Sequence, residues 1–195
     1  MARDCSQGAR MTWHGTVATE LMDGPAAARA EDAFRLIYAE AFAEHPYDEA
    51  EDDVAAAFRR FPVQVRRPTF RAASARTGDG EPVGMAYGHT LGADTGWWDE
   101  LTVPVPDDVR REDGQRTFGL LELAVRRVWR GQGVARRLHE TLLDGLTAER
   151  VLLNVHPGSA AASAAYRAWG YRRIGEARPW GGSGELHDVM LLDLS

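Results

Sequence analysis

The sequence contains no lysine, and all 23 of its basic residues are arginine. The missing lysine excludes enzymes that form a Schiff base on a lysine side chain, and also phosphate-binding loops that end in Gly-Lys-Ser or Gly-Lys-Thr. Cysteine is nearly absent as well, since Cys5 stands alone. A single cysteine excludes a disulfide within the chain and is typical of a reducing compartment, so we expect a cytoplasmic protein.

Long apolar runs are also missing. No stretch reaches the ~18 apolar residues of a membrane span, so we expect no membrane partner. The six histidines show no His-x-x-x-His spacing and Cys-x-x-Cys cannot occur, so we expect no metal site. The first 15 residues have no signal-peptide core. We interpret residues 1–15 as a loose leader and residues 16–195 as a single domain.

The net charge of −6 disfavours a general nucleic-acid binder. The arginines nevertheless concentrate in residues 126–137, which read RRVWRGQGVARR. A local cationic patch on an acidic protein favours a small anionic ligand over a polymer. A solvated helix face is the alternative explanation for part of this patch.

Hydrophobic periodicity and turn signals predict a mixed α/β domain whose central sheet is mainly antiparallel and flanked by helices. Proline is expected to end the second helix at Pro62. The expected strands are residues 16–21, 70–76, 83–89, 117–125, 151–155, 171–175 and 186–194, and the expected helices are residues 24–43, 48–61, 131–146 and 159–169.

A long irregular segment, residues 90–116, separates two of these strands. Its adjacent Trp97 and Trp98 either line a substrate cleft or pack the segment onto the domain, and the sequence does not choose between them. The segment is also acidic. An acidic rim attracts cationic amines, whereas a solvated loop explains the same composition without a ligand.

The segment from Arg130 to Ala135, Arg-Gly-Gln-Gly-Val-Ala, joins the central strand to the next helix. Its two glycines allow a tight turn and a close approach of the backbone to a ligand. The first turn of the following helix has N–H groups without intrahelical partners, and the helix dipole favours negative charge there. This combination suits a phosphate or diphosphate.

This order of elements and this turn resemble the GNAT superfamily of N-acetyltransferases. Arg130, Gly133 and Ala135 satisfy the family pattern of Arg or Gln, two residues, Gly, one residue, and Gly or Ala. Leu123-Ala124-Val125 is similar to the apolar strand end before that motif, and the segment from Tyr166 to Tyr171 is similar to the family's Tyr-x-x-x-Gly-aromatic helix end. The match runs element by element from residue 70 to about residue 189. The helices before residue 70 match the family only as generic helices.

The resemblance implies a GNAT-like fold and acetyl-CoA as the acyl donor. Backbone N–H groups of the turn would hold the pyrophosphate, and the strand end would pair with the pantetheine arm. Ser159 stands where the family often has Asn, so it keeps a helix cap but shortens the reach toward the cofactor. The residues implied in cofactor binding are Leu123, Ala124, Val125, Arg130, Gly131, Gln132, Gly133, Val134, Ala135 and Ser159.

Two side chains are candidates for the chemistry. Glu122 lies between Leu121 and Leu123 in the central strand, where burial would raise its pKa and suit a general base; a paired structural glutamate is the alternative. Tyr166 is placed by the resemblance near the thioester sulfur as the acid, and a core tyrosine is the alternative. The N–H of Val125 is the expected oxyanion donor.

These inferences predict an acetyl-CoA-dependent N-acetyltransferase that acts by direct transfer on a primary amine of a small molecule or peptide, as a monomer or homodimer. One alternative is a non-catalytic acyl-CoA-binding regulatory or sensor module on the same fold. A nucleotide-binding enzyme is the other alternative, although the turn lacks Gly-x-Gly-x-x-Gly.

Overall fold

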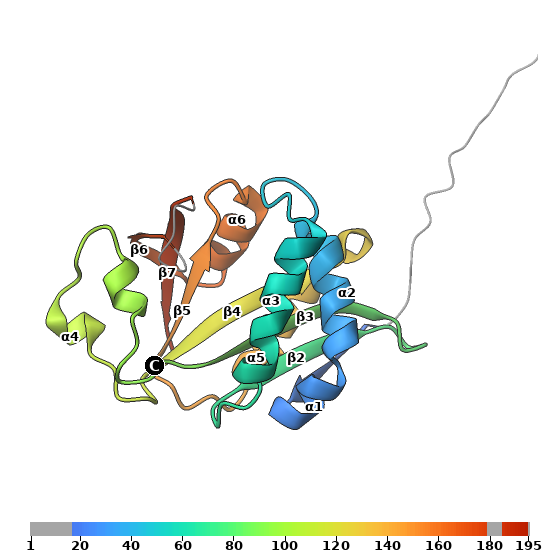
Figure 1. Ribbon diagram of the computed structural model, residues 1–195, viewed down its shortest axis with the longest axis horizontal. Helices are drawn as coiled ribbons and strands as arrows, with labels where there is room; N and C mark the ends of the chain where they lie inside the picture. The colour runs from blue at the N-terminus through green and yellow to red at the C-terminus, as the bar shows by residue number, and fades with distance from the viewer. Residues whose placement is uncertain (1–16, 179–184, 195) are drawn as a thin grey trace, which may run out of the picture.

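A seven-stranded sheet organises the part of the chain that the computed structural model describes, residues 17–178 and 185–194 (Figure 1). The predicted leader, residues 1–15, lies outside this part. The strands are β1 (Ala18–Met22), β2 (Arg71–Arg76), β3 (Pro82–Thr90), β4 (Thr117–Val125), β5 (Arg150–Val155), β6 (Arg172–Ala177) and β7 (His187–Asp193). Their order is β1-β2-β3-β4-β5-β7-β6, and only the β4–β5 neighbours are parallel. This arrangement confirms the predicted mixed, mainly antiparallel fold.

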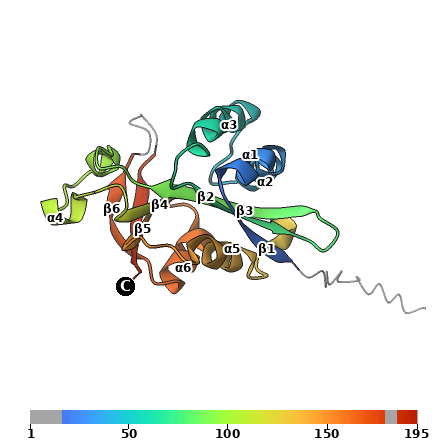
Figure 2. The ribbon, with the colours of Figure 1, turned by 90° about the horizontal axis from the view of Figure 1, so that it is seen from below.

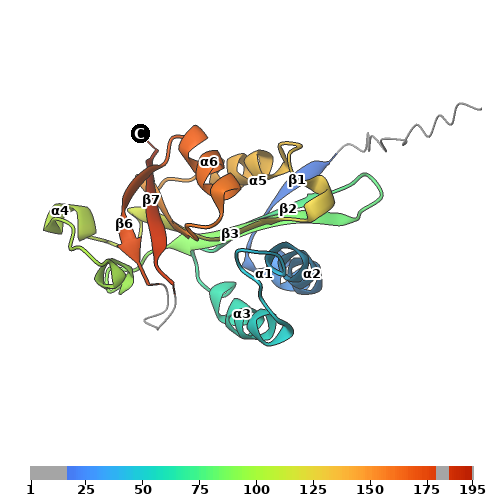
Figure 3. The same cartoon turned by 90° about the horizontal axis from the view of Figure 1, so that it is seen from above.

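Helices cover both faces of the sheet (Figures 2 and 3). On one face lie α1 (Gly24–Arg29), α2 (Glu31–Phe42) and α3 (Glu51–Gln64), and on the other lie α5 (Val134–Leu143) and α6 (Ala160–Ala168). Each layer buries its own apolar cluster, with Phe34 and Phe61 under the first and Leu138 and Leu142 under the second. None of the described helices is long and apolar enough to span a bilayer.

Three helix predictions were wrong in detail. The expected helix 131–146 is shorter at both ends, because α5 begins at Val134 and ends at Leu143. The expected helix 24–43 is two helices that meet at Ala30, whose φ of −96° and ψ of 9° interrupt the regular turn. Pro62 does not end α3 but lies inside its last turn. A proline there removes one backbone hydrogen bond, and the complete burial of its neighbour Phe61 offsets that loss.

The long β3–β4 connection contains a short 3-10 helix, η1 (Trp97–Glu100), and one turn of helix, α4 (Asp107–Arg110). Trp98 is buried with apolar residues of β5, β6 and β7, and its Nε1 donates to Glu112 Oε1 at 3.0 Å. Arg150 pairs with the same Glu112 oxygen at 3.0 Å. For Trp98 the packing alternative is therefore correct, because its ring anchors the connection to the sheet.

Candidate active site

The site begins where two parallel strands separate. β4 and β5 pair only from Thr117 to Gly119 and from Arg150 to Leu152. Past these residues the β5-facing edge of β4 has no strand partner among the described residues. An open edge inside a sheet leaves backbone donors and acceptors available for an extended ligand.

Val125 directs its peptide group into this opening. The N–H of the next residue, Arg126, donates to Val83 O in β3 at 2.9 Å. Because successive residues in a strand point their backbone groups to opposite sides, the N–H and C=O of Val125 face away from β3. The carbonyl accepts from Arg130 Nε at 3.0 Å, and the N–H faces the same opening.

The turn after β4 exposes a row of unpaired amides. It runs through the 3-10 helix η2 (Arg127–Trp129), and both Gly131 and Gly133 then adopt positive φ, 72° and 74°. Within the described residues, no backbone acceptor receives the N–H groups of residues 131–136. These six consecutive amides are therefore available to an anion at the start of α5.

The expectation that the Arg130 N–H is also free was wrong, because it donates to Arg127 O at 3.2 Å. The Arg130 side chain is engaged as well, since its Nη1 lies 2.9 Å from Glu44 Oε2. Arg126 is likewise paired, with its Nε 2.6 Å from Glu40 Oε2. Much of the arginine patch thus ties α2 to the end of β4 and is already neutralised.

Arg137 differs from these arginines. It makes no ion pair with any described residue, and its Nη1 donates only to Gln132 O at 3.3 Å. A Cβ built on Gly133 would lie 3.4 Å from the same Nη1, so the guanidinium lies against the row of unpaired amides. This side chain adds positive charge where an anion would bind.

Glu122 faces the α2–α3 layer because of a β-bulge. Tyr87 of β3 is opposite Glu122 while Gly88 is opposite Leu120, so Leu121 is an extra residue in β4. Glu122 shares its face with Ala124, which packs in the cluster under α2 and α3. The bulge therefore places a carboxylate on an otherwise apolar face.

The environment of Glu122 raises its pKa to about 8. Burial raises this pKa most, the charge of Glu49 raises it further, and the charge of Arg60 lowers it. The residue keeps some exposed surface, and no described residue donates a hydrogen bond to it. A carboxylate that is largely desolvated, unpaired and still accessible has the properties of a general base.

Tyr166 reaches the same region from α6. It is buried, and its ring packs edge-on against Trp169 at 5.5 Å and Tyr171 at 5.3 Å between ring centroids. Burial raises the Tyr166 pKa most, followed by Tyr47 and the charge of Glu122. The structure thus brings Glu122 and Tyr166 within electrostatic range, and the phenol keeps its proton at neutral pH.

The loop between α2 and α3 reaches across to the start of α6 (Figure 1). Tyr47 packs edge-on against His156 at 5.6 Å between ring centroids, and burial raises the pKa of its phenol, with Ser159 acting in the opposite direction. The predicted side-chain cap by Ser159 was wrong, because Ser159 is the N-cap residue of α6 but its side chain makes no capping hydrogen bond. This loop connects the two helical layers beside the opening between β4 and β5.

His156 is a structural loop residue. Its Nδ1 accepts from the N–H of Gly158 at 3.0 Å, which leaves Nε2 as the protonated nitrogen facing Glu185 Oε2 at 2.7 Å. Both ring nitrogens are hydrogen-bonded, which fixes the orientation of the ring in the loop. Within residues 17–178 and 185–194, no group of three or more His, Cys, Asp or Glu side chains could hold a metal ion.

Sequence reasoning missed the contribution of the α2–α3 loop. Tyr38 OH donates to Glu49 Oε1 at 3.1 Å, and the charge of Glu49 contributes to the raised pKa of Glu122. The sequence pattern places Tyr38 only on an apolar helix stripe and gives Glu49 no role. The one available signal was the run Tyr-Asp-Glu directly after His45-Pro46, which places acidic and phenolic groups in a helix-to-helix turn.

Comparisons with known proteins agree with this geometry. A family model described as the acetyltransferase (GNAT) family matches residues 29–171, including α2 and α3, which the sequence pattern alone identifies only as generic helices. The comparison with curated proteins found no match.

Solved structures share the fold at low sequence identity. The ribosomal-protein-S18-alanine N-acetyltransferase from Escherichia coli is 19% identical, with a TM-score of 0.59 over 92% of this chain and 95% of that one. An acetyltransferase from Thermus thermophilus is 21% identical, with a TM-score of 0.57 over 92% and 97%. The PaiA N-acetyltransferase from Thermoplasma acidophilum, in complex with coenzyme A, is 11% identical, with a TM-score of 0.57 over 91% and 99%.

Proposed function

We propose that this chain, which belongs to the acetyltransferase (GNAT) family, is an acetyl-CoA-dependent N-acetyltransferase that acetylates a primary amine of a small molecule or peptide. Family membership confirms the resemblance predicted from the turn and its flanking motifs. The observation that carries the finer proposal is the unpaired, desolvated Glu122 beside an open strand edge. Residues 16–195 as one catalytic domain, and a monomer or homodimer, remain predictions.

The residues of the opening fit coenzyme A. Six unpaired amides at residues 131–136, with Arg137 beside them, suit its diphosphate. The open edge of β4 at Leu123 and Val125 suits the amide groups of its pantetheine arm, and the side chain of the intervening Ala124 packs under α2 and α3. Coenzyme A supplies an activated acyl thioester when bound.

Proton transfer from the acceptor is the first task of the protein. An alkyl amine is protonated at neutral pH and cannot attack a carbonyl until it loses that proton. Glu122 accepts the proton, directly or through one water molecule, because its raised pKa brings it nearer to that of the amine. The amine lone pair then attacks the thioester carbonyl carbon.

The charges that form next have candidate partners. The Val125 N–H, which faces the opening, donates to the oxyanion of the tetrahedral intermediate. When the carbon–sulfur bond breaks, Tyr166 donates a hydrogen bond to the departing thiolate. Its raised pKa makes it a hydrogen-bond donor rather than a strong acid. The thiolate gains its proton from Glu122, and the nitrogen of the intermediate releases its second proton to solvent as it becomes an amide.

An amine panel with acetyl-CoA tests the proposal. We expect thiol release that depends on the amine, together with a product that is heavier by one acetyl group. Tight binding of acetyl-CoA with no thiol release for any amine would favour the acyl-CoA-binding sensor instead. Calorimetry that shows preference for NAD or ATP over coenzyme A would contradict both functions.

A further inference from the structure

We propose, resting on the function proposed above, that the acceptor is a dication: a primary amine with a second cationic nitrogen that Glu49 holds while Glu122 deprotonates the first. The proposal rests on four side chains, Tyr38, Tyr47, Glu49 and Glu122, which we call the acid–phenol cluster. They come from α2, the α2–α3 loop and β4.

Glu49 is held in place with one oxygen unused. Its backbone N–H donates to Phe42 O at 3.0 Å, which fixes the end of the loop. Its Oε1 accepts from Tyr38 OH at 3.1 Å. Its Oε2 is buried and has no hydrogen-bond partner among the described residues. A buried carboxylate oxygen without a donor is costly, and an ammonium group of a ligand would satisfy it.

The packing links the two carboxylates. Tyr38, which donates to Glu49, packs in the same apolar cluster as Tyr87, the residue opposite Glu122 in β3. The charge of Glu49 also contributes to the raised pKa of Glu122. The rings of Tyr38 and Tyr47 both pack against the Phe42 ring, at 4.4 Å and 4.7 Å between ring centroids. Carboxylates next to aromatic faces are the groups that bind alkylammonium ions.

A ligand cation that survives the reaction would compensate the charge of Glu49. Burial raises the pKa of the Glu49 carboxyl, while the hydrogen bond from Tyr38 and the charge of Arg60 act in the opposite direction. When Glu122 takes the proton from the reacting amine, both of these groups become neutral and the charge of Glu49 remains. Because a partly buried charge is costly without a partner, a second nitrogen that keeps its proton is the matching ligand group.

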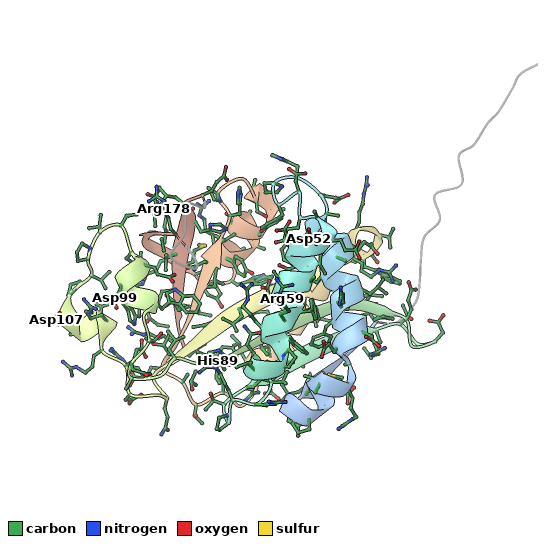
Figure 4. The ribbon with its side chains drawn as sticks, viewed as in Figure 1. Asp52, Arg59, His89, Asp99, Asp107 and Arg178 are labelled. Carbon is green, nitrogen blue, oxygen red and sulfur yellow. The ribbon has the colours of Figure 1, made fainter. Side chains whose placement is uncertain are left out.

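The acidic residues of the β3–β4 connection do not provide this site. Asp99 is paired with Arg110 at 2.5 Å, and Glu112 is buried against Arg150. Asp99 and Asp107 also lie far from Asp52 at the start of α3 (Figure 4). The acid–phenol cluster is therefore separate from the acidic rim considered from the sequence.

Matched amine pairs test the proposal. We would measure kcat/KM for propane, butane and pentane α,ω-diamines and for the monoamines of the same chain length. The wild-type protein is expected to favour the best diamine by about 10- to 100-fold, the effect of one charge-assisted hydrogen bond. In Glu49→Gln the ratio should fall to about one. In Glu20→Gln, which changes an exposed glutamate on β1, the ratio should not change.

Each other outcome has a defined meaning. A diamine-to-monoamine ratio near one in the wild-type protein, or an unchanged ratio in Glu49→Gln, overturns the dication claim and leaves acetyl transfer intact. Acetylation confined to the N-terminus of an uncharged peptide overturns it too. No acetylation of any amine instead overturns the proposed function. If Glu49→Gln does not fold, Tyr38→Phe keeps the ring, removes the donor to Glu49 and must lower the same ratio.

Discussion

At the scale of single residues, the account depends on the protonation of Glu122. Its pKa of about 8 means that the base form predominates only above that pH. Because kcat/KM reports the ionisation of the free enzyme, the wild-type profile should rise with pH and bend near 8. Glu122→Gln should lose about 10²- to 10⁴-fold in kcat/KM above pH 8 and should lack this bend. An identical profile in the variant would remove Glu122 from the mechanism.

The same pKa has a consequence for stability. A carboxyl group with a raised pKa binds more protons in the folded than in the unfolded protein between pH 4.5 and about 8. Its contribution to the free energy of unfolding therefore falls as the pH rises through that window. Above pH 8, Glu122→Gln should therefore be more stable than the wild type. The full pKa shift corresponds to roughly 5 kcal/mol, and the partial exposure of Glu122 makes the gain smaller. Thermal unfolding at pH 4 and pH 9 measures the difference.

The residues that the sequence could identify are those inside a motif. Glu122 and Tyr166 were predicted because the strand and the helix end that carry them have recognisable patterns, and the structure brings them within electrostatic range. Glu49 belongs to no such pattern. Its role depends on the β-bulge at Leu121 and on the α2–α3 loop, which brings Glu49 next to Tyr38. Neither feature is encoded in local periodicity.

At the scale of elements, the turn before α5 combines a backbone requirement with an open space. Gly133→Glu must place a side chain at a φ of 74° and a negative charge beside the unpaired amides. We expect coenzyme A affinity to fall by more than about 100-fold. Gly145→Glu is the matched control, because Gly145 also has positive φ, 65°, but lies after α5. Equal losses in both variants would attribute the effect to backbone strain alone.

Two neighbouring arginines on α5 provide a second comparison. Arg137 lies against the amide row without an ion pair to any described residue, whereas Arg136 is paired with Glu140 at 2.8 Å. Arg137→Gln should weaken coenzyme A binding by about 10-fold, and the loss should shrink at high salt. Arg136→Gln should leave the affinity nearly unchanged. Calorimetry at two ionic strengths measures both, and equal effects would mean that the whole helix face attracts the ligand.

Element boundaries followed local signals where these were strong. The strands around the Thr77–Gly80 turn and the central strand were predicted within a residue or two, because alternation and turn residues define them. The errors at Ala30 and Pro62 arise from packing. Burial of Phe61 and Phe34 against β3 decides the path of the helices, and no window of sequence contains that contact.

At the scale of the whole molecule, the β3–β4 connection is secured by a buried charge pair. Arg150 also donates to Thr117 Oγ1 at 2.7 Å and lies 5.1 Å from the Trp98 ring centroid. Arg150→Met should lower the free energy of unfolding by about 3–5 kcal/mol, because Glu112 would remain buried without its partner. Arg150→Met combined with Glu112→Leu should cost less than the single change. Denaturant unfolding that shows no loss in Arg150→Met would contradict this role.

The central claim is that the free amides at the start of α5 bind the diphosphate of coenzyme A, and residue-resolved amide NMR tests it most directly. On titration with coenzyme A, the resonances of residues 131–136 should shift together and their hydrogen exchange should slow, with smaller changes at Leu123 and Val125. The result that would contradict the account is saturation with coenzyme A while the amides of residues 131–136 keep both their resonances and their exchange rates.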